Sequence, residues 1–163
     1  LILHDHPAFN KIRIDAAGVI TDIPRPYGSE GLAFTGIHIL EPEMLSHIPE
    51  GFSDIVDTYR RLMGAGKTIL SHVSRGHSWH DIGSLPDYLK ANRDHALTPF
   101  TIGLGCDIHP SVDLTDWVVI GASCRLEKGV KISRSVLWDG VEVREGVRVA
   151  DSVVTPNGIC QTA

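Results

Sequence analysis

The second half of the sequence is organised by apolar residues that recur every six positions. From Ile102 onward, an aliphatic residue opens each hexad, and a small or medium apolar residue follows four positions later. These pairs are Ile102/Cys106, Ile108/Val112, Leu114/Val118, Ile120/Cys124, Leu126/Val130 and Ile132/Val136. One five-residue step then shifts the register, and the pattern continues as Leu137/Val141, Val143/Val147 and Val149/Val153.

A period of six predicts a parallel β-helix. Helices need apolar spacings of three and four, and ordinary half-buried strands need a spacing of two. Each hexad is expected to form a short strand and a turn, and three hexads to form one triangular coil, which gives about three coils. We expect Ile102, Ile120 and Leu137 to stack along one face, and the five-residue step to appear as a distorted corner. A β-sandwich is the alternative, but its strands would not hold this period.

The first hundred residues follow a different pattern, in which short strands alternate with helices. Alternating apolar and polar residues predict strands, and apolar residues at helical spacing, with Ser53 and Ser84 as N-caps, predict helices. The expected elements are a hairpin over 11–15 and 19–23, strands over 32–40 and 68–73, and helices over 41–48, 53–63 and 84–97. This alternation indicates an α/β architecture, with a domain boundary near residues 98–101.

The composition is that of a globular protein. Of 163 residues, 42% are hydrophobic and 21% charged, which is ordinary for such a domain. The net charge of −5 argues against a nucleic-acid surface, and no apolar run approaches the roughly 20 residues of a membrane span. Three cysteines without metal-ligand spacing predict reduced thiols and a cytoplasmic protein. Cys106 and Cys124 should lie at equivalent corners of adjacent coils, where two core residues are favoured over a disulfide.

Several short motifs occur in an order that resembles one enzyme family. They are Phe34-Thr-Gly-Ile37, Glu41-Pro-Glu43, Phe52-Ser-Asp-Ile55, Trp79-His-Asp-Ile-Gly83 and Asp87-Tyr-Leu-Lys-Ala-Asn-Arg93. This order resembles the C-terminal half of the sugar-1-phosphate nucleotidyltransferases, which include mannose-1-phosphate guanylyltransferases and glucose-1-phosphate thymidylyl- and uridylyltransferases. Many members carry a hexapeptide β-helix directly after the last motif. The resemblance implies an incomplete, Rossmann-like α/β half-domain over 1–100 and a left-handed parallel β-helix over 101–163.

The resemblance also implies which residues bind the substrate and the metal. Thr35 and Gly36 would line the sugar pocket, where a glycine lets a sugar hydroxyl approach the backbone. Asp81, in the W-x-D-I-G motif, would bind Mg²⁺, which usually takes only one or two protein carboxylates. Arg25 stands where the family has a lysine facing the sugar phosphate, and its fork of donors suits a phosphate. Pro24 replaces the family's acidic residue, so this match is partial.

The implied reaction converts a nucleoside triphosphate and a sugar-1-phosphate into a nucleotide sugar and pyrophosphate. Magnesium and basic side chains would neutralise charge while the sugar phosphate attacks the α-phosphorus in line. The family's glycine-rich nucleotide-binding loop and its second metal-binding aspartate are expected to lie outside this sequence, which begins at Leu1. We therefore expect a fragment that has no activity alone, with neither nucleic acid nor membrane as a partner.

Two other functions fit parts of the sequence. Hexapeptide-repeat proteins are often acyltransferases that use a histidine as general base, and His109 is the histidine of the repeat. A non-catalytic regulatory or assembly subunit would instead use the β-helix to form homo-oligomers. Trp117, Val119 and Trp138 are expected to face outward and are the candidate contacts, because exposed aromatic residues often mark interfaces.

Overall fold

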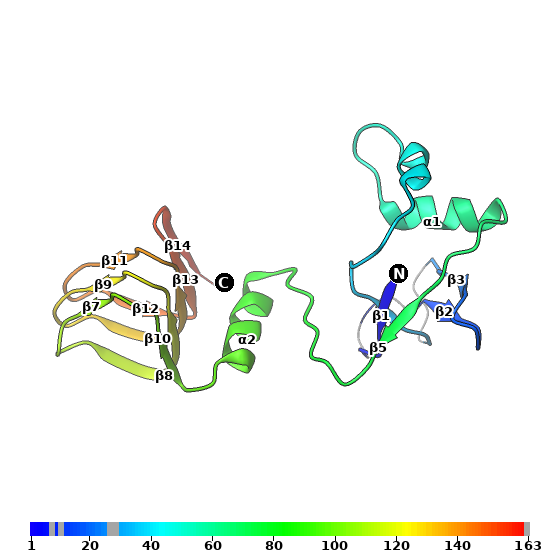
Figure 1. Cartoon of the computed structure of the whole chain (residues 1–163). Coiled ribbons are helices and arrows are strands. Elements are labelled where there is room, and N and C mark those ends of the chain that lie inside the picture. The colour runs from blue at the N-terminus through cyan, green and yellow to red at the C-terminus, as the bar shows by residue number, and fades with distance from the viewer. Residues whose placement is uncertain (7–8, 10–11, 26–29, 162–163) are drawn as a thin grey trace. The chain divides into compact units, whose positions relative to one another are not determined.

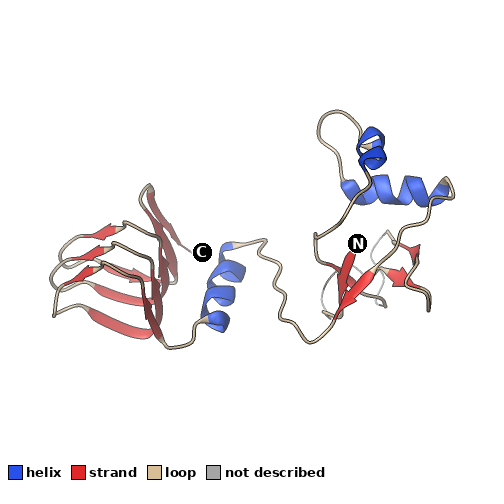
Figure 2. Ribbon diagram, in the orientation of Figure 1, coloured by secondary structure: helices blue, strands red, loops and turns tan. Residues whose placement is uncertain are grey.

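The structure is a computed structural model, and it describes residues 1–6, 9, 12–25 and 30–161. The chain divides into two compact units, Leu1–Trp79 and His80–Ala163. The first is a mixed α/β unit, and the second combines one helix with a stack of short strands (Figures 1 and 2). No helix in these ranges is long and apolar enough to cross a membrane.

The first unit is built on a small mixed sheet with a buried central strand. Strand β1 (Ile2–His4) pairs antiparallel with β4 (Ala33–Phe34) and parallel with β5 (His72–Ser74). Leu3, in the middle of β1, is fully buried. The strand predicted over 32–40 is much shorter in the structure, because Gly36 adopts a φ of +83° and turns the chain out of the sheet.

The predicted hairpin forms as β2 (Arg13–Ile14) and β3 (Ile20–Asp22), which pair antiparallel. Its turn is fixed by Asp15, whose Oδ1 accepts hydrogen bonds from the backbone N–H groups of Ala17 and Val19, each at 2.9 Å. An aspartate at the start of a turn satisfies backbone donors that the turn leaves unpaired. The polar residue between the two apolar runs therefore closes the hairpin.

Two helical segments complete the first unit: the 3₁₀ helix η1 (Pro42–His47) and α1 (Ile55–Gly64). The N-cap of α1 is Asp54, whose side chain accepts from the N–H of Val56 at 2.8 Å, so the predicted cap at Ser53 is displaced by one residue. Helix α1 buries Tyr59 against the sheet. The buried apolar cluster of this unit contains Leu3, Ile12, Ile20, Ile23, Met44 and Tyr59.

The second unit contains the predicted parallel β-helix, whose short strands stack coil upon coil (Figure 2). β14 (Gly158–Gln161) ends the stack by pairing antiparallel with β13 (Ser152–Thr155). The parallel strands are β6 (Phe100–Ile102), β7 (Asp107–Ile108), β8 (Asp113–Ile120), β9 (Arg125–Leu126), β10 (Lys131–Leu137), β11 (Glu142–Val143), β12 (Arg148–Ala150) and β13 (Ser152–Thr155).

The strand register shows the coil length directly. Ile102 lies beside Ile120, 18 residues later, and Ile120 lies beside Leu137, 17 residues later. These three residues stack as predicted. The register shifts between Ser133 and Ser135, which confirms the distorted corner expected after the five-residue step. Coils of this length account for about three turns of the β-helix.

The register shift also changes which side chains point inward. Ser135 pairs with Val118, and both are fully buried. Val136, the next residue, joins Val153 and Leu89 in a separate apolar cluster. Val136 and Val153, each the second apolar residue of its hexad, therefore pack outside the main core of the β-helix. The inward position beside Val118 is filled by a serine, because the coil is one residue shorter at this corner and Ser135, not Val136, pairs with Val118.

Helix α2 (Leu85–His95) packs on the outer face of the β-helix. It contacts β8, β10 and β13, and Leu89 lies in the buried cluster with Val136 and Val153. The sequence-based division at residues 100 and 101 follows the change of pattern. The compact units divide instead between Trp79 and His80, because α2 buries its apolar face on the β-helix.

The outward-facing residues proposed as oligomer contacts lie at this same helix. Trp117 and Val119 pack against the Leu89 cluster, and the Trp138 Nε1–H donates to the hydroxyl of Tyr88 at 3.1 Å. An intramolecular contact therefore explains why apolar residues face outward on these strands. They give no support to a homo-oligomer, which stays a prediction.

The three cysteines lie within the described residues and are free thiols. Cys106 and Cys124 occupy adjacent coils, and their Sγ atoms donate to backbone carbonyls of Gly121 and Trp138, each at 3.1 Å. Burial raises the pKa of the Cys124 thiol. The prediction of two core residues instead of a disulfide is confirmed.

Candidate functional site

Thr35 and Gly36 form the turn that follows β4. The Thr35 N–H and Oγ1 both donate to the carbonyl of Ile2, at 3.2 and 2.9 Å, and the Thr35 Oγ1 accepts from the N–H of Ile37 at 3.2 Å. Gly36 is exposed, and no heavy atom of the described residues lies within 4 Å of the position that a Cβ would occupy. The threonine hydroxyl thus holds the turn, while open space surrounds the glycine.

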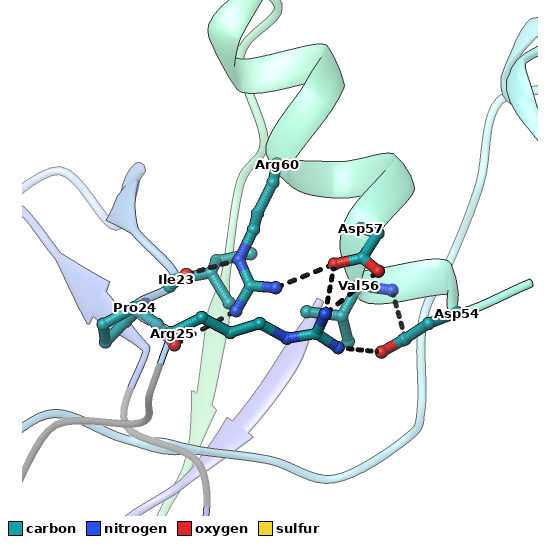
Figure 3. Close-up of polar contacts among 7 residues, drawn as sticks. All are labelled: Ile23, Pro24, Arg25, Asp54, Val56, Asp57 and Arg60. Atoms are coloured by element: carbon teal, nitrogen blue, oxygen red, sulfur yellow. Dashed lines mark hydrogen bonds and ion pairs between the residues drawn. The ribbon is translucent and has the colours of Figure 1, made fainter.

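Arg25 belongs to an ion-pair network with the first turns of α1 (Figure 3). Its Nη2 lies 2.7 Å from Asp54 Oδ2, and its Nη1 lies 3.1 Å from Asp57 Oδ1. Arg60 donates to the same Asp57 Oδ1 at 2.9 Å, and also to the carbonyls of Ile23 and Pro24 at 2.6 and 3.0 Å. Two guanidinium groups face two carboxylates. A phosphate would therefore have to compete with Asp54 and Asp57 for Arg25.

Asp81 lies in the loop between Trp79 and α2, and its side chain is exposed. It belongs to the unit that begins at His80, whereas Arg25, Thr35 and Gly36 belong to the unit that ends at Trp79. Among the described residues, no three His, Cys, Asp or Glu side chains are grouped to hold a metal ion. A single exposed carboxylate still fits magnesium, because this ion completes its shell with water and substrate phosphates.

A further acidic residue, which sequence reasoning did not name, lies at the carboxyl edge of the parallel strands β1 and β5. Asp5 directly follows β1, and its Oδ1 is 3.4 Å from Nδ1 of the buried His4. In open α/β sheets, ligands bind outside the carboxyl ends of parallel strands. The signal in the sequence was the apolar run Leu1-Ile-Leu3 followed at once by polar residues.

An aromatic cluster occupies the same edge of the sheet. The Trp79 ring centroid lies 6.0 Å from that of His4, 5.6 Å from that of His6 and 5.4 Å from that of Phe9. His4 Nε2 also makes a 2.9 Å hydrogen bond with the carbonyl of His77. Trp79, which opens the W-x-D-I-G motif, is thus packed against residues that directly follow β1.

The histidine considered for acyl transfer is part of a local turn. His109 Nδ1 lies 2.8 Å from the Ser111 hydroxyl and accepts from the Ser111 N–H at 3.1 Å. The same hydroxyl accepts from the N–H of Gly129, on the next coil, at 2.9 Å. His109 is exposed, and its imidazole bonds to Ser111, whose hydroxyl joins the two coils.

Comparison with known proteins decides the family. The model of the family described as "Nucleotidyl transferase" matches residues 5–97, more than half of the chain. The chain belongs to the nucleotidyl transferase family. A UTP–glucose-1-phosphate uridylyltransferase of Synechocystis sp. is 28% identical over 162 residues, covering 86% of this chain and 41% of the relative. The chain therefore spans less than half the length of that relative. The resemblance based on the ordered motifs is confirmed.

The family match covers every residue considered for binding the sugar, the phosphate or the metal ion. Asp5, Arg25, Thr35, Gly36 and Asp81 all lie within residues 5–97, as does the whole of α2. The β-helix lies beyond the matched segment. Helix α2 therefore belongs to the nucleotidyl transferase segment by sequence and to the β-helix unit by packing. The predicted roles of the individual residues stay predictions.

Proposed function

We propose that this protein takes part in sugar-1-phosphate nucleotidyl transfer, in which a nucleoside triphosphate and a sugar-1-phosphate give a nucleotide sugar and pyrophosphate. The observation that carries the proposal is the family match over residues 5–97. The name of the Synechocystis relative supports UTP and glucose-1-phosphate as the first pair to test. Three free thiols are consistent with a cytoplasmic protein.

The proposal gives different tasks to the two units. In the first, the open backbone at Gly36 is the place where a sugar could approach, since a side chain is absent and space is free. Arg25 would meet the phosphate only after leaving Asp54 or Asp57. In the second, Asp81 would supply one carboxylate to Mg²⁺. When bound, that ion would neutralise charge on the α-phosphate of the nucleotidyl group that is transferred.

The test is pyrophosphate release from UTP and glucose-1-phosphate, measured with this chain alone and with the full gene product. We expect turnover only with the full gene product, because the glycine-rich loop that would cradle the triphosphate is not found in this sequence. Turnover by this chain alone would contradict the expected fragment. The absence of turnover from the full product with all common sugar-1-phosphates and nucleoside triphosphates would contradict the proposed function.

Single carboxylates can then be assigned in the full gene product. Asp81→Asn preserves size and removes the charge, and it should lower kcat by about 100-fold or more if Asp81 holds the ion. Asp5→Asn tests the carboxylate at the sheet edge in the same way. Asp107→Asn is the matched control, because its side chain is 79% exposed on the β-helix. Near wild-type turnover of Asp81→Asn at saturating Mg²⁺ would exclude it as a metal ligand.

A further inference from the structure

The loop that carries Asp81 is attached to α2 at both of its ends. At the start of the loop, the His80 ring packs edge-on against the ring of His95, the last residue of α2, with centroids 5.1 Å apart. At the end of the loop, the Ser84 hydroxyl accepts a hydrogen bond from the Asp87 N–H at 3.3 Å and caps the first turn of α2. Asp81 therefore lies between two residues that are both held by the same helix.

Helix α2 is in turn held by the β-helix. Leu89 is 7% exposed and packs with Val136 and Val153. The Tyr88 hydroxyl accepts the 3.1 Å hydrogen bond from Trp138 Nε1, beyond the end of β10. An 11-residue helix is marginal by itself in water, so the face that it buries on β8, β10 and β13 supplies much of its stability.

We propose that the β-helix positions Asp81, with α2 as the rigid connection and His80 as a positioning residue. The coils hold α2, α2 holds both ends of the loop, and the loop presents the carboxylate at a fixed place. The inference rests on the proposed function only for what Asp81 binds. In this proposal the β-helix holds the loop that carries Asp81 in place, in addition to any role in assembly.

The first experiment undocks α2 in the whole chain. Leu89→Asn places a polar amide in the buried cluster, whereas Leu97→Asn makes the same change at a leucine that is 99% exposed. In wild type and in Leu97→Asn, the ¹⁵N order parameters of residues 80–84 should be about 0.85, and in Leu89→Asn they should fall below about 0.6. Hydrogen exchange in α2 should become at least about 30-fold faster in Leu89→Asn alone.

A milder pair of variants keeps the test informative if Leu89→Asn disturbs the whole unit. Tyr88→Phe removes only the hydroxyl and should speed hydrogen exchange in α2 by about 5-fold. His80→Ala should loosen residues 81–83 while exchange in α2 stays at the wild-type rate, and His80→Phe should restore the loop because it keeps an aromatic ring against His95. A loop that stays rigid in both His80→Ala and Leu89→Asn would overturn the inference.

Metal binding is measured separately, with Mn²⁺ as the probe and the paramagnetic loss of amide signals in residues 81–83 as the readout. We expect the apparent Kd for Mn²⁺ to rise about 10-fold in Leu89→Asn and His80→Ala, since only the ordered fraction of the loop binds. An unchanged Kd in both variants would overturn the positioning role. If Mn²⁺ still causes the signal loss in Asp81→Asn, Asp81 is not the metal ligand that the proposed function requires. The order parameters would still test whether the β-helix holds the loop through α2.

Discussion

Gly121 lies where two coils of the β-helix approach each other closely, and Gly121→Ala is therefore a sharp test of the packing. A Cβ at this position would lie 2.6 Å from the backbone nitrogen of Asp139 and 2.8 Å from the carbonyl carbon of Trp138. Favourable carbon contacts are about 3.5–4.0 Å. The Asp139 Oδ1 also obstructs the added Cβ, and because the other two atoms belong to the backbone, the next coil must shift to accommodate the methyl group.

The loss of folding stability can be estimated from the hydrogen bonds that this shift of the coil would disturb. The Gly121 N–H donates to the carbonyl of Leu137 at 2.8 Å, and the Ala122 N–H donates to Asp139 Oδ1 at 2.6 Å. Overpacking costs about 1–3 kcal/mol, and the loss of a hydrogen bond to a charged group costs about 1.5–3 kcal/mol. We expect Gly121→Ala to lower the free energy of unfolding of the second unit by about 3–5 kcal/mol.

Urea unfolding followed by tryptophan fluorescence and circular dichroism measures this change. The matched control is Gly64→Ala at the end of α1, where no described heavy atom lies within 4 Å of the added Cβ. That substitution should be neutral or should stabilise the first unit by up to about 1 kcal/mol, since alanine favours the helix. A Gly121→Ala protein within about 0.5 kcal/mol of wild type would refute the close approach of the coils.

Three further outcomes are expected. Hydrogen bonds from Arg134 hold the pKa of the Asp151 carboxyl in the folded protein below its usual value. The stabilisation that results is fully present when the pH is above the pKa of this carboxyl in the unfolded chain. It is lost as the pH falls through the pKa of this carboxyl in the folded protein. The urea midpoint should therefore drop less between pH 7 and pH 3 in Asp151→Asn than in wild type. A thiol reagent should label exposed Cys160 quickly and buried Cys124 only as the unit unfolds, as peptide mapping would show. Arg25→Ala should lower the stability of the first unit by about 1 kcal/mol or less in thermal unfolding, because its ion pairs are solvent-exposed.

The period of six was sufficient to predict the β-helix, since each coil repeats one local geometry and buries the same position every time. The stack of Ile102, Ile120 and Leu137 and the irregular corner after Ile132 both followed from counting residues. The family was likewise visible from the order of short motifs. Sequence reasoning works well here because both signals are repeated or ordered along the chain, so that no single residue has to carry them.

Only the tertiary structure decided which surfaces meet. From the sequence, Val136 is a position of the repeat and Trp117 is a candidate oligomer contact, yet both lie at the helix α2 interface. A pattern of apolar residues cannot say which neighbour covers them. Arg25 reads as a free phosphate ligand, but Asp54 and Asp57, some thirty residues away, face its guanidinium. Asp5 had no motif of its own, and it became a candidate because β5 pairs beside β1. Long-range contacts of this kind depend on the whole fold, whereas the sequence by itself determined the repeats, the Ser84 cap of α2 and the family.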